Sequence, residues 1–324
     1  MTEPKTDTVH PKRGLHILQV VLLVLIVLML GVPLFIIIYN HIPPLYIPGT
    51  EWRIDHVLTF SAVFISVYYL ARRIRHILFL VFATGLFTMM VLTFMGRYSF
   101  PQLVNDYRKF IFSINHSAIQ FKFQEAENPE DNVFPHASEF RNAIDYRNSL
   151  VRNYAAEVAV KHFDDYHYSG DIRILQYFSV FKEIRKRWRY VYDPTSGDYF
   201  ASASETVSQL RTDGKFKGDC DDYSILMAAC IKAIGGQVKL VRTQVNSGGM
   251  LTGHVYPEVF VGNKKDLENI NYLIHEALFV KESKDKPIYY HVDASHNVWL
   301  NFDYNDYYPG GKYQSTVRMG ELII

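Results

Sequence analysis

The stretch Gly218-Asp219-Cys220-Asp221-Asp222-Tyr223-Ser224 determines how the rest of the chain is interpreted. An apolar run over residues 225–234 follows it and ends at Gly235-Gly236, a pattern that predicts a buried helix. Asp219 is suited to cap this helix, which places Cys220 in the first turn. Backbone N–H groups would then point at the sulfur, and we expect them to lower the pKa of the thiol and favour the nucleophilic thiolate.

Two later segments supply the partners that a nucleophilic thiolate needs. Residues 253–261 are predicted to form a strand opened by His254, and residues 288–295 a second strand that ends near an aspartate. A catalytic thiol needs a base to take its proton and a third group to orient that base. The order cysteine, histidine, aspartate therefore indicates a cysteine enzyme.

In this order the segments resemble the transglutaminase-like superfamily of cysteine enzymes, over roughly residues 180–311. That superfamily carries a Gly-x-Cys helix start, a helix closing in Gly, a strand beginning Gly-His and a strand ending in Asp-Pro-Thr or a variant. The Asp-Cys-Asp-Asp-Tyr form at residues 219–223 looks most like the bacterial transglutaminase-like cysteine peptidases. The resemblance implies an α+β fold with a papain-like core, in which the nucleophile helix packs on an antiparallel sheet.

The resemblance also implies a role for each catalytic residue. Cys220 would be the nucleophile, His254 the general base and Asp293 the third member, with Ala and Ser following it in place of Pro and Thr. Asp303, in the aromatic setting of residues 299–304, is the alternative third member. Either carboxylate would fix the tautomer of His254 and stabilise its imidazolium. The Cys220 backbone N–H would meet the oxyanion, together with a second donor that the sequence does not identify.

Three carboxylates next to the cysteine create an electrostatic difficulty. Asp219, Asp221 and Asp222 should raise the pKa of the thiol by like-charge repulsion, against the effect of the helix dipole. In the peptidases that the motif resembles, carboxylates here can hold calcium, a cation that prefers oxygen ligands. The alternative is that they are ordinary caps and solvated charges of the helix start. No cofactor is required, and a zinc site of Cys220, His254 and an aspartate is disfavoured.

The first hundred residues are too apolar for a soluble domain. Apolar runs at about residues 15–39, 54–70 and 77–95 predict three transmembrane helices, although the second is short and could instead lie in the interface or pack on its neighbours. A basic turn at residues 72–76 and the basic N-terminus, which includes Lys5, would both be cytoplasmic. Three crossings then place everything after the third helix outside the cytoplasm. We therefore expect a multi-pass protein of the cell (inner) membrane, with an extracytoplasmic or periplasmic catalytic domain.

This interpretation divides the chain into three parts. Residues 1–100 would be the membrane domain, residues 101–170 a helical stalk with a helix over 138–163, and residues 171–324 the catalytic domain. A charged insertion at residues 262–287 would be either a peripheral hairpin or a lid on the cleft. The two cysteines, Cys220 and Cys230, would lie about 15 Å apart on one helix and cannot form a disulfide with each other.

The charge of the chain argues against a nucleic-acid partner, and one segment is locally basic. The formal net charge of +1 gives no electrostatic case for a nucleic-acid partner. The basic segment 182–194 could bind anionic lipid or another polyanion, but a solvated helix face followed by packed aromatics is the favoured interpretation.

The expected function is therefore that of a membrane-anchored cysteine hydrolase or acyltransferase, most plausibly a peptidase. It would act through a thioester on protein or peptide substrates at the cell surface, and its other partner would be the lipid bilayer. The alternative is a catalytically silent transglutaminase-like fold that serves as a membrane-tethered binding module.

Overall fold

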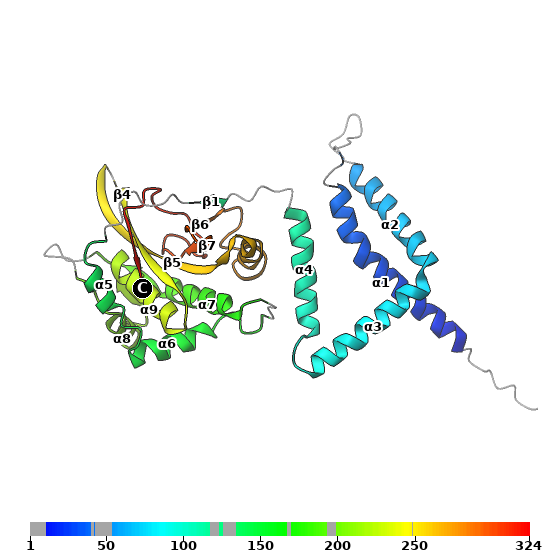
Figure 1. Ribbon diagram of the computed structural model, residues 1–324, viewed down its shortest axis with the longest axis horizontal. Coiled ribbons are helices and arrows are strands. Elements are labelled where there is room, and N and C mark those ends of the chain that lie inside the picture. The colour runs from blue at the N-terminus through cyan, green and yellow to red at the C-terminus, as the bar shows by residue number, and fades with distance from the viewer. Residues whose placement is uncertain are drawn as a thin grey trace, which may run out of the picture. The chain divides into compact units, whose positions relative to one another are not determined.

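The computed structural model in Figure 1 describes residues 11–39, 42, 54–116, 123–125, 134–166, 170–192, 199–247 and 249–324. The chain forms two compact units, Met1–Gln120 and Phe121–Ile324. This division differs from the expected three parts, because the region assigned to a stalk is shared between the two units. The N-terminal residues 1–10, including Lys5, lie outside the described residues.

The first unit is helical. Its helices are α1 (Pro11–Tyr39), α2 (Asp55–Arg73), α3 (Arg75–Phe94) and α4 (Phe100–His116). Within the described residues, two segments are long and apolar enough to cross a membrane, Gln19–Tyr39 and Arg75–Phe94. The helix α2 does form where a second span was expected, but it is not one of these two segments. The structure thus supports two candidate spans rather than clearly three.

The second unit contains most of the region expected to be a stalk. Instead of one helix over 138–163 there are two, α5 (Ala137–Ala143) and α6 (Ser149–Ala159). The break occurs because the Asn148 side chain accepts a hydrogen bond from the Leu150 backbone N–H and starts a new helix. Both helices bury apolar side chains in the main core of the second unit, so they are part of that unit's fold.

A six-stranded sheet forms the centre of the second unit. The strand order is β1-β6-β7-β5-β4-β8, antiparallel except for the parallel β1–β6 pair. A short parallel pair, β2–β3, lies apart from it. The strands are β1 (Phe123–Glu125), β2 (Trp188–Tyr190), β3 (Phe216–Gly218), β4 (Val238–Ser247), β5 (Met250–Asn263), β6 (Ile288–Val292), β7 (Asn297–Asn301) and β8 (Gly320–Ile323). The fold is α+β, as the sequence predicts.

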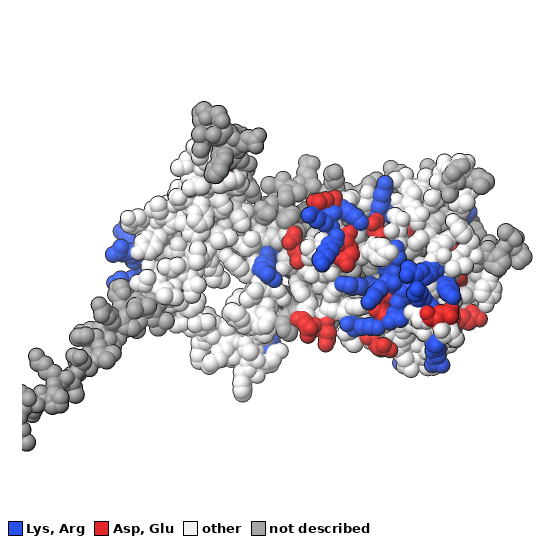
Figure 2. All heavy atoms as spheres, turned by 180° about the vertical axis from the view of Figure 1, so that it is seen from behind, with Lys and Arg blue, Asp and Glu red and all other residues white. Residues whose placement is uncertain are grey.

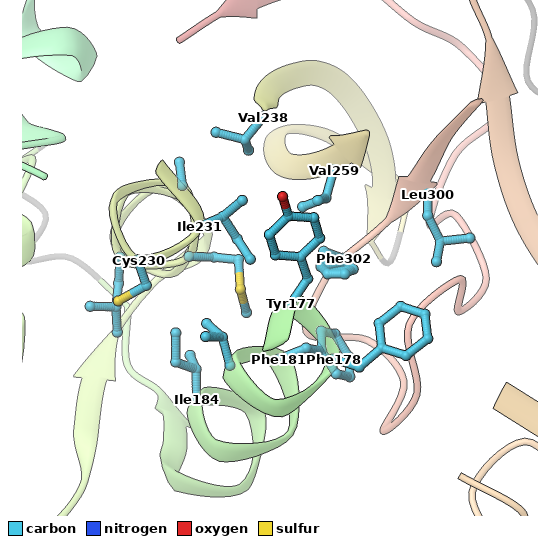
Figure 3. Packing of buried hydrophobic residues seen from close by; sticks show 14 of the residues in the cluster. Tyr177, Phe178, Phe181, Ile184, Cys230, Ile231, Val238, Val259, Leu300 and Phe302 are labelled. Atoms are coloured by element: carbon cyan, nitrogen blue, oxygen red, sulfur yellow. The ribbon is translucent and has the colours of Figure 1, made fainter. Parts of the chain in front are cut away.

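Helices pack on one face of this sheet and form the core. The helix α7 (Ile172–Arg187) places Phe178, Phe181 and Ile184 in the main core, where the two rings contact Phe302, and all three side chains are fully buried, as their helical spacing predicts (Figure 3). The helix α9 (Cys220–Ala233) is buried along most of its length and packs on β5. A further helix, α8 (Ala203–Asp213), begins with a complete capping box at Ser202.

The charged insertion is neither the hairpin nor the lid that the sequence suggested. It forms a 3-10 turn (Lys264–Asp266), α10 (Leu267–Tyr272) and a π-helix (Leu273–Leu278), whose apolar side chains enter the main core. Because the insertion leaves β5 at Asn263, nine residues beyond His254, it begins about 30 Å along the strand from that histidine. A cavity of about 250 Å³ opens at this end of the sheet.

The opposite face of the sheet buries a network of charges. Arg318 donates to both carboxylate oxygens of Glu258, at 2.8 and 3.0 Å, and the two side chains are almost fully buried. The Lys239 ammonium lies 3.3 Å from Glu258 and 2.9 Å from Glu321. Burial alone would raise the pKa of Glu258, but Arg318 and Lys239 lower it to about 2.

We expect Arg318→Ala to lower the free energy of unfolding by about 3–5 kcal/mol, because it leaves the buried Glu258 charge without its main partner. The matched control is Arg173→Ala, which removes an exposed ion pair with Asp171 and should change stability little. Thermal unfolding of the purified full chain in detergent measures both. Equal shifts for the two variants would contradict the assignment of a stabilising role to the buried pair.

Candidate active site

Cys220 occupies the first turn of α9, as the sequence predicts. The Asp219 side chain caps the helix by accepting from the backbone N–H groups of Asp221 at 2.9 Å and Asp222 at 3.4 Å. The buried Asp222 carboxylate accepts from the Ala201 backbone N–H at 2.9 Å. A Cβ at Gly218 would overlap the Asp222 carboxylate, so the glycine allows the chain to approach the helix start closely. Gly218, Asp219 and Asp222 of the motif thus each have a structural role at the start of the helix.

His254 and Asp303 form a buried pair beside this helix start. The His254 Nε2 and Asp303 Oδ2 atoms are 2.8 Å apart, and the residues are 4% and 3% exposed. The other Asp303 oxygen accepts from the Tyr304 backbone N–H at 2.7 Å. The Gln314 amide donates to Asp303 Oδ2 at 3.0 Å. With Nε2 committed to the carboxylate, Nδ1 is the ring nitrogen left to exchange a proton with a reacting group.

The cysteine sulfur lies against the strand that carries His254. The backbone of Val255, the residue after His254, lowers the pKa of the Cys220 thiol and the charge of Asp303 raises it, so both groups lie near the sulfur. The Ser224 hydroxyl ties the same helix to the same strand by donating to the Val255 carbonyl at 3.0 Å. The structure therefore brings Cys220, His254 and Asp303 into one region.

The carboxylate beside His254 is Asp303, the alternative, and not Asp293. Asp293 instead accepts from the Trp299 indole at 2.8 Å and from Asn297 and Ser295, and these bonds hold the β6–β7 turn together. These hydrogen bonds outweigh the effect of partial burial and lower the pKa of Asp293 to about 2.

Strand register explains why Asp293 and His254 are separated. In the antiparallel β5–β7 pair, Asn297 lies opposite Asn263, so the β6–β7 turn sits at the far end of β5 from His254. The chain then runs back along β5, where the Phe302 N–H donates to the Pro257 carbonyl at 3.0 Å. Asp303 follows Phe302 directly and therefore lies at the His254 end of β5.

The thiol of Cys220 is protonated in this arrangement, contrary to the expected effect of the helix dipole. Burial raises the pKa of Cys220 far above its ordinary value, and the charges of Asp221 and Asp219 raise it further. The thiol donates toward Asp221 Oδ1 at a sulfur–oxygen distance of 3.7 Å. Reactivity at this site therefore requires a base that removes the thiol proton.

Aromatic residues that the sequence analysis did not single out surround the site. The Tyr304 ring packs edge-on against His254, with centroids 5.7 Å apart, and against Tyr223 at 5.4 Å. Tyr190 in turn contacts Tyr304 at 5.5 Å. Gln314, which donates to Asp303, lies in a segment without any motif, so only the fold could reveal it.

The carboxylates proposed for calcium already serve as hydrogen-bond acceptors. Asp219 caps α9, Asp222 holds the Ala201 N–H, and Asp221 faces the thiol. Calcium binding by these three stays a prediction. Across the described residues, the clustered ligand atoms that meet the geometric requirement for a metal belong to Glu258, His291 and Glu321. The Lys239 ammonium fills that space, within 3.3 Å of all three side chains.

Comparisons with known proteins do not assign the chain to a family, so the interpretation of the site rests on its geometry. No family model matches the sequence, and no curated protein matches it. Among solved structures, the chain is similar to one described as a "putative cysteine protease" from Cytophaga hutchinsonii, with 14% sequence identity and a TM-score of 0.31. The match covers 60% of this chain and 50% of that chain, so it spans half the length of the solved structure.

We expect Asp221→Asn to lower the pKa of the Cys220 thiol, because the substitution removes the nearest negative charge. At a fixed pH below that pKa, alkylation of Cys220 by iodoacetamide should become about tenfold faster for each unit by which the pKa falls. The matched control is Asp213→Asn, which removes an exposed carboxylate paired with Lys217. Mass spectrometry of Cys220 over a pH series measures both rates, and identical pH profiles would contradict the assigned role of Asp221.

Proposed function

We propose that the chain is a membrane-anchored cysteine hydrolase that uses Cys220, His254 and Asp303 on peptide or side-chain amides. The observation that supports it most is the buried 2.8 Å contact between His254 and Asp303, a carboxylate whose charge also acts on the thiol of the helix-start Cys220. A fold does not need this combination for stability, whereas a nucleophilic enzyme does. This proposal replaces Asp293 by Asp303 as the third catalytic group.

In the proposed reaction His254 acts as a general base on a neutral thiol. Nδ1 takes the proton of the Cys220 thiol as the sulfur attacks the amide carbon, and Asp303 stabilises the resulting imidazolium. The tetrahedral intermediate collapses to a thioester when His254 returns the proton to the leaving amine. Water then attacks the thioester with His254 again accepting a proton, and the free thiol and a carboxylic acid result.

The Cys220 backbone N–H at the start of α9 is the proposed donor to the oxyanion, because the first N–H groups of a helix have no partner within the helix. Resolution of the thioester by water means proteolysis or deamidation, and resolution by an amine means cross-linking. The resemblance of the 219–223 motif to bacterial peptidases favours proteolysis.

The membrane part of the proposal extends beyond the two candidate spans. We infer that α2 also crosses, because the two basic segments lie on the cytoplasmic side together only if an even number of crossings, those of α1 and α2, separates them. The second unit then lies outside the cytoplasm, and its substrates are proteins or peptides at the cell surface.

One observation favours a second candidate, a silent binding module of the same fold. The raised pKa of the Cys220 thiol is what an inert, buried cysteine would also have. The two candidates differ in whether His254 and Asp303 accelerate chemistry at the sulfur.

We expect new protein termini in membrane fractions that contain the wild-type chain and none with Cys220→Ala. Asp303→Asn should lower their rate of formation by about 100-fold or more, because it removes the acceptor that orients His254. The control is Asp293→Asn, which alters only the β6–β7 turn and should retain activity per folded molecule. Terminus-selective proteomics measures all four samples. Identical termini in wild-type and Cys220→Ala samples, with no new isopeptide links, would favour the binding module.

A further inference from the structure

A strip of basic and aromatic side chains lies on the surface where β2 pairs with β3. Arg189 is opposite Lys217 in this pair, and both are exposed. The exposed Lys215 directly precedes β3. The chain continues from β2 through Val191, whose N–H donates to the Gly218 carbonyl at 2.9 Å. We call Arg189, Tyr190, Val191, Tyr192, Lys215 and Lys217 the β2–β3 strip.

The positive charge of this strip is only partly compensated. Lys217 pairs with Asp213 at 2.6 Å. Among the residues that the structure describes, neither Arg189 nor Lys215 has an ion-pair partner. Arg187, bonded to Glu183, also reaches the strip and donates to the Gly214 carbonyl at 3.0 Å. On the one face of the molecule drawn in Figure 2, Lys and Arg side chains gather over part of the surface, with Asp and Glu side chains at its borders. Since the net charge of the whole chain is only +1, such a concentration is a local feature.

The strip also exposes apolar and aromatic surface. Val191 is 48% exposed and Tyr192 83% exposed, and Tyr190 packs edge-on against Tyr192 with centroids 5.0 Å apart. Tyrosines beside basic residues are typical of segments at the boundary between lipid headgroups and acyl chains. A purely electrostatic partner such as nucleic acid or a soluble acidic protein would not require the exposed valine. This composition therefore favours a lipid surface.

We propose that the β2–β3 strip docks on anionic lipid headgroups. Each basic residue near an anionic surface is attracted to it, and the attraction is summed over the strip. The candidate spans keep a bilayer within reach, so docking is intramolecular in effect and needs only modest intrinsic affinity. The inference depends on the proposed membrane anchoring and is independent of catalysis.

Docking would also place the candidate active site at the lipid surface. Tyr190 of the strip contacts Tyr304, and Tyr304 contacts His254. Burial raises the pKa of Tyr190, and Cys220, Asp219 and Asp221 raise it further, so this ring lies near the start of α9. The proposed substrates are thereby narrowed to peptide segments that lie next to the membrane.

The test uses the full-length Cys220→Ala chain in nanodiscs, so that its result does not depend on catalysis. One set of discs contains only phosphatidylcholine, and the other contains a large fraction of phosphatidylglycerol. Lysines are acetylated briefly and quantified by mass spectrometry. We expect Lys215 and Lys217 to react at least about threefold more slowly in the anionic discs, with the protection lost in high salt. The exposed Lys281 and Lys284 serve as internal controls and should react equally in both.

A charge-reversed variant completes the test. Arg189→Glu should abolish the protection of Lys215 and Lys217, and unchanged Lys281 and Lys284 reactivity would show that the fold is intact. Equal reactivity of Lys215 and Lys217 in the two kinds of disc would overturn the proposal. Protection by soluble polyglutamate in the neutral discs, without protection by anionic lipid, would also overturn it and assign the strip to an acidic protein.

Discussion

The buried hydrogen bond between His254 and Asp303 is the constraint on which the candidate site depends. His254 lies on β5, opposite Thr243 of β4 and under α9, and Asp303 follows the end of β7. Asp303 lies at the His254 end of β5 because β7 runs antiparallel to β5 and the chain after β7 bonds to Pro257 through Phe302. The buried Asp303 carboxylate is bonded to Nε2 of His254. Nδ1 is therefore the ring nitrogen that the proposed mechanism uses for proton transfer. The site is thus a consequence of sheet register.

The neutral state of Cys220 decides which mechanism this constraint can support. A helix start alone would favour a thiolate, but burial and the adjacent Asp221 and Asp219 outweigh that effect here. In the proposed mechanism the resting site therefore holds a thiol, and His254 removes its proton during the attack. The carboxylates of the motif have local structural roles as a cap and as acceptors of backbone N–H groups.

The sequence predicted the elements better than it predicted their register. The cap at Asp219, the helix start at Cys220 and the buried face of α7 follow from local spacing, and each is found in the structure. Asp293 and Asp303 could not be separated by local pattern, because both lie at the end of an apolar strand. Their difference arises from pairing between strands distant in sequence.

Other differences have the same kind of origin. The helix expected over 138–163 is divided by the Asn148 cap, and its parts enter the core of the second unit, which no local charge pattern shows. The insertion after Asn263 contributes to the core because its apolar residues face inward, at the end of β5 remote from His254. The pKa of Cys220 depended on burial, which a sequence does not contain.

The most direct test of the account is the rate at which Cys220 is acetylated by p-nitrophenyl acetate. The account predicts a rapid burst of acetylation at Cys220 in the wild-type chain, about 100-fold or more faster than in His254→Ala, and lability of the adduct to hydroxylamine. Buried Cys230 is the internal reference and should remain unmodified. Acetylation of Cys220 at the same rate with and without His254 would contradict the claim that the imidazole activates the sulfur.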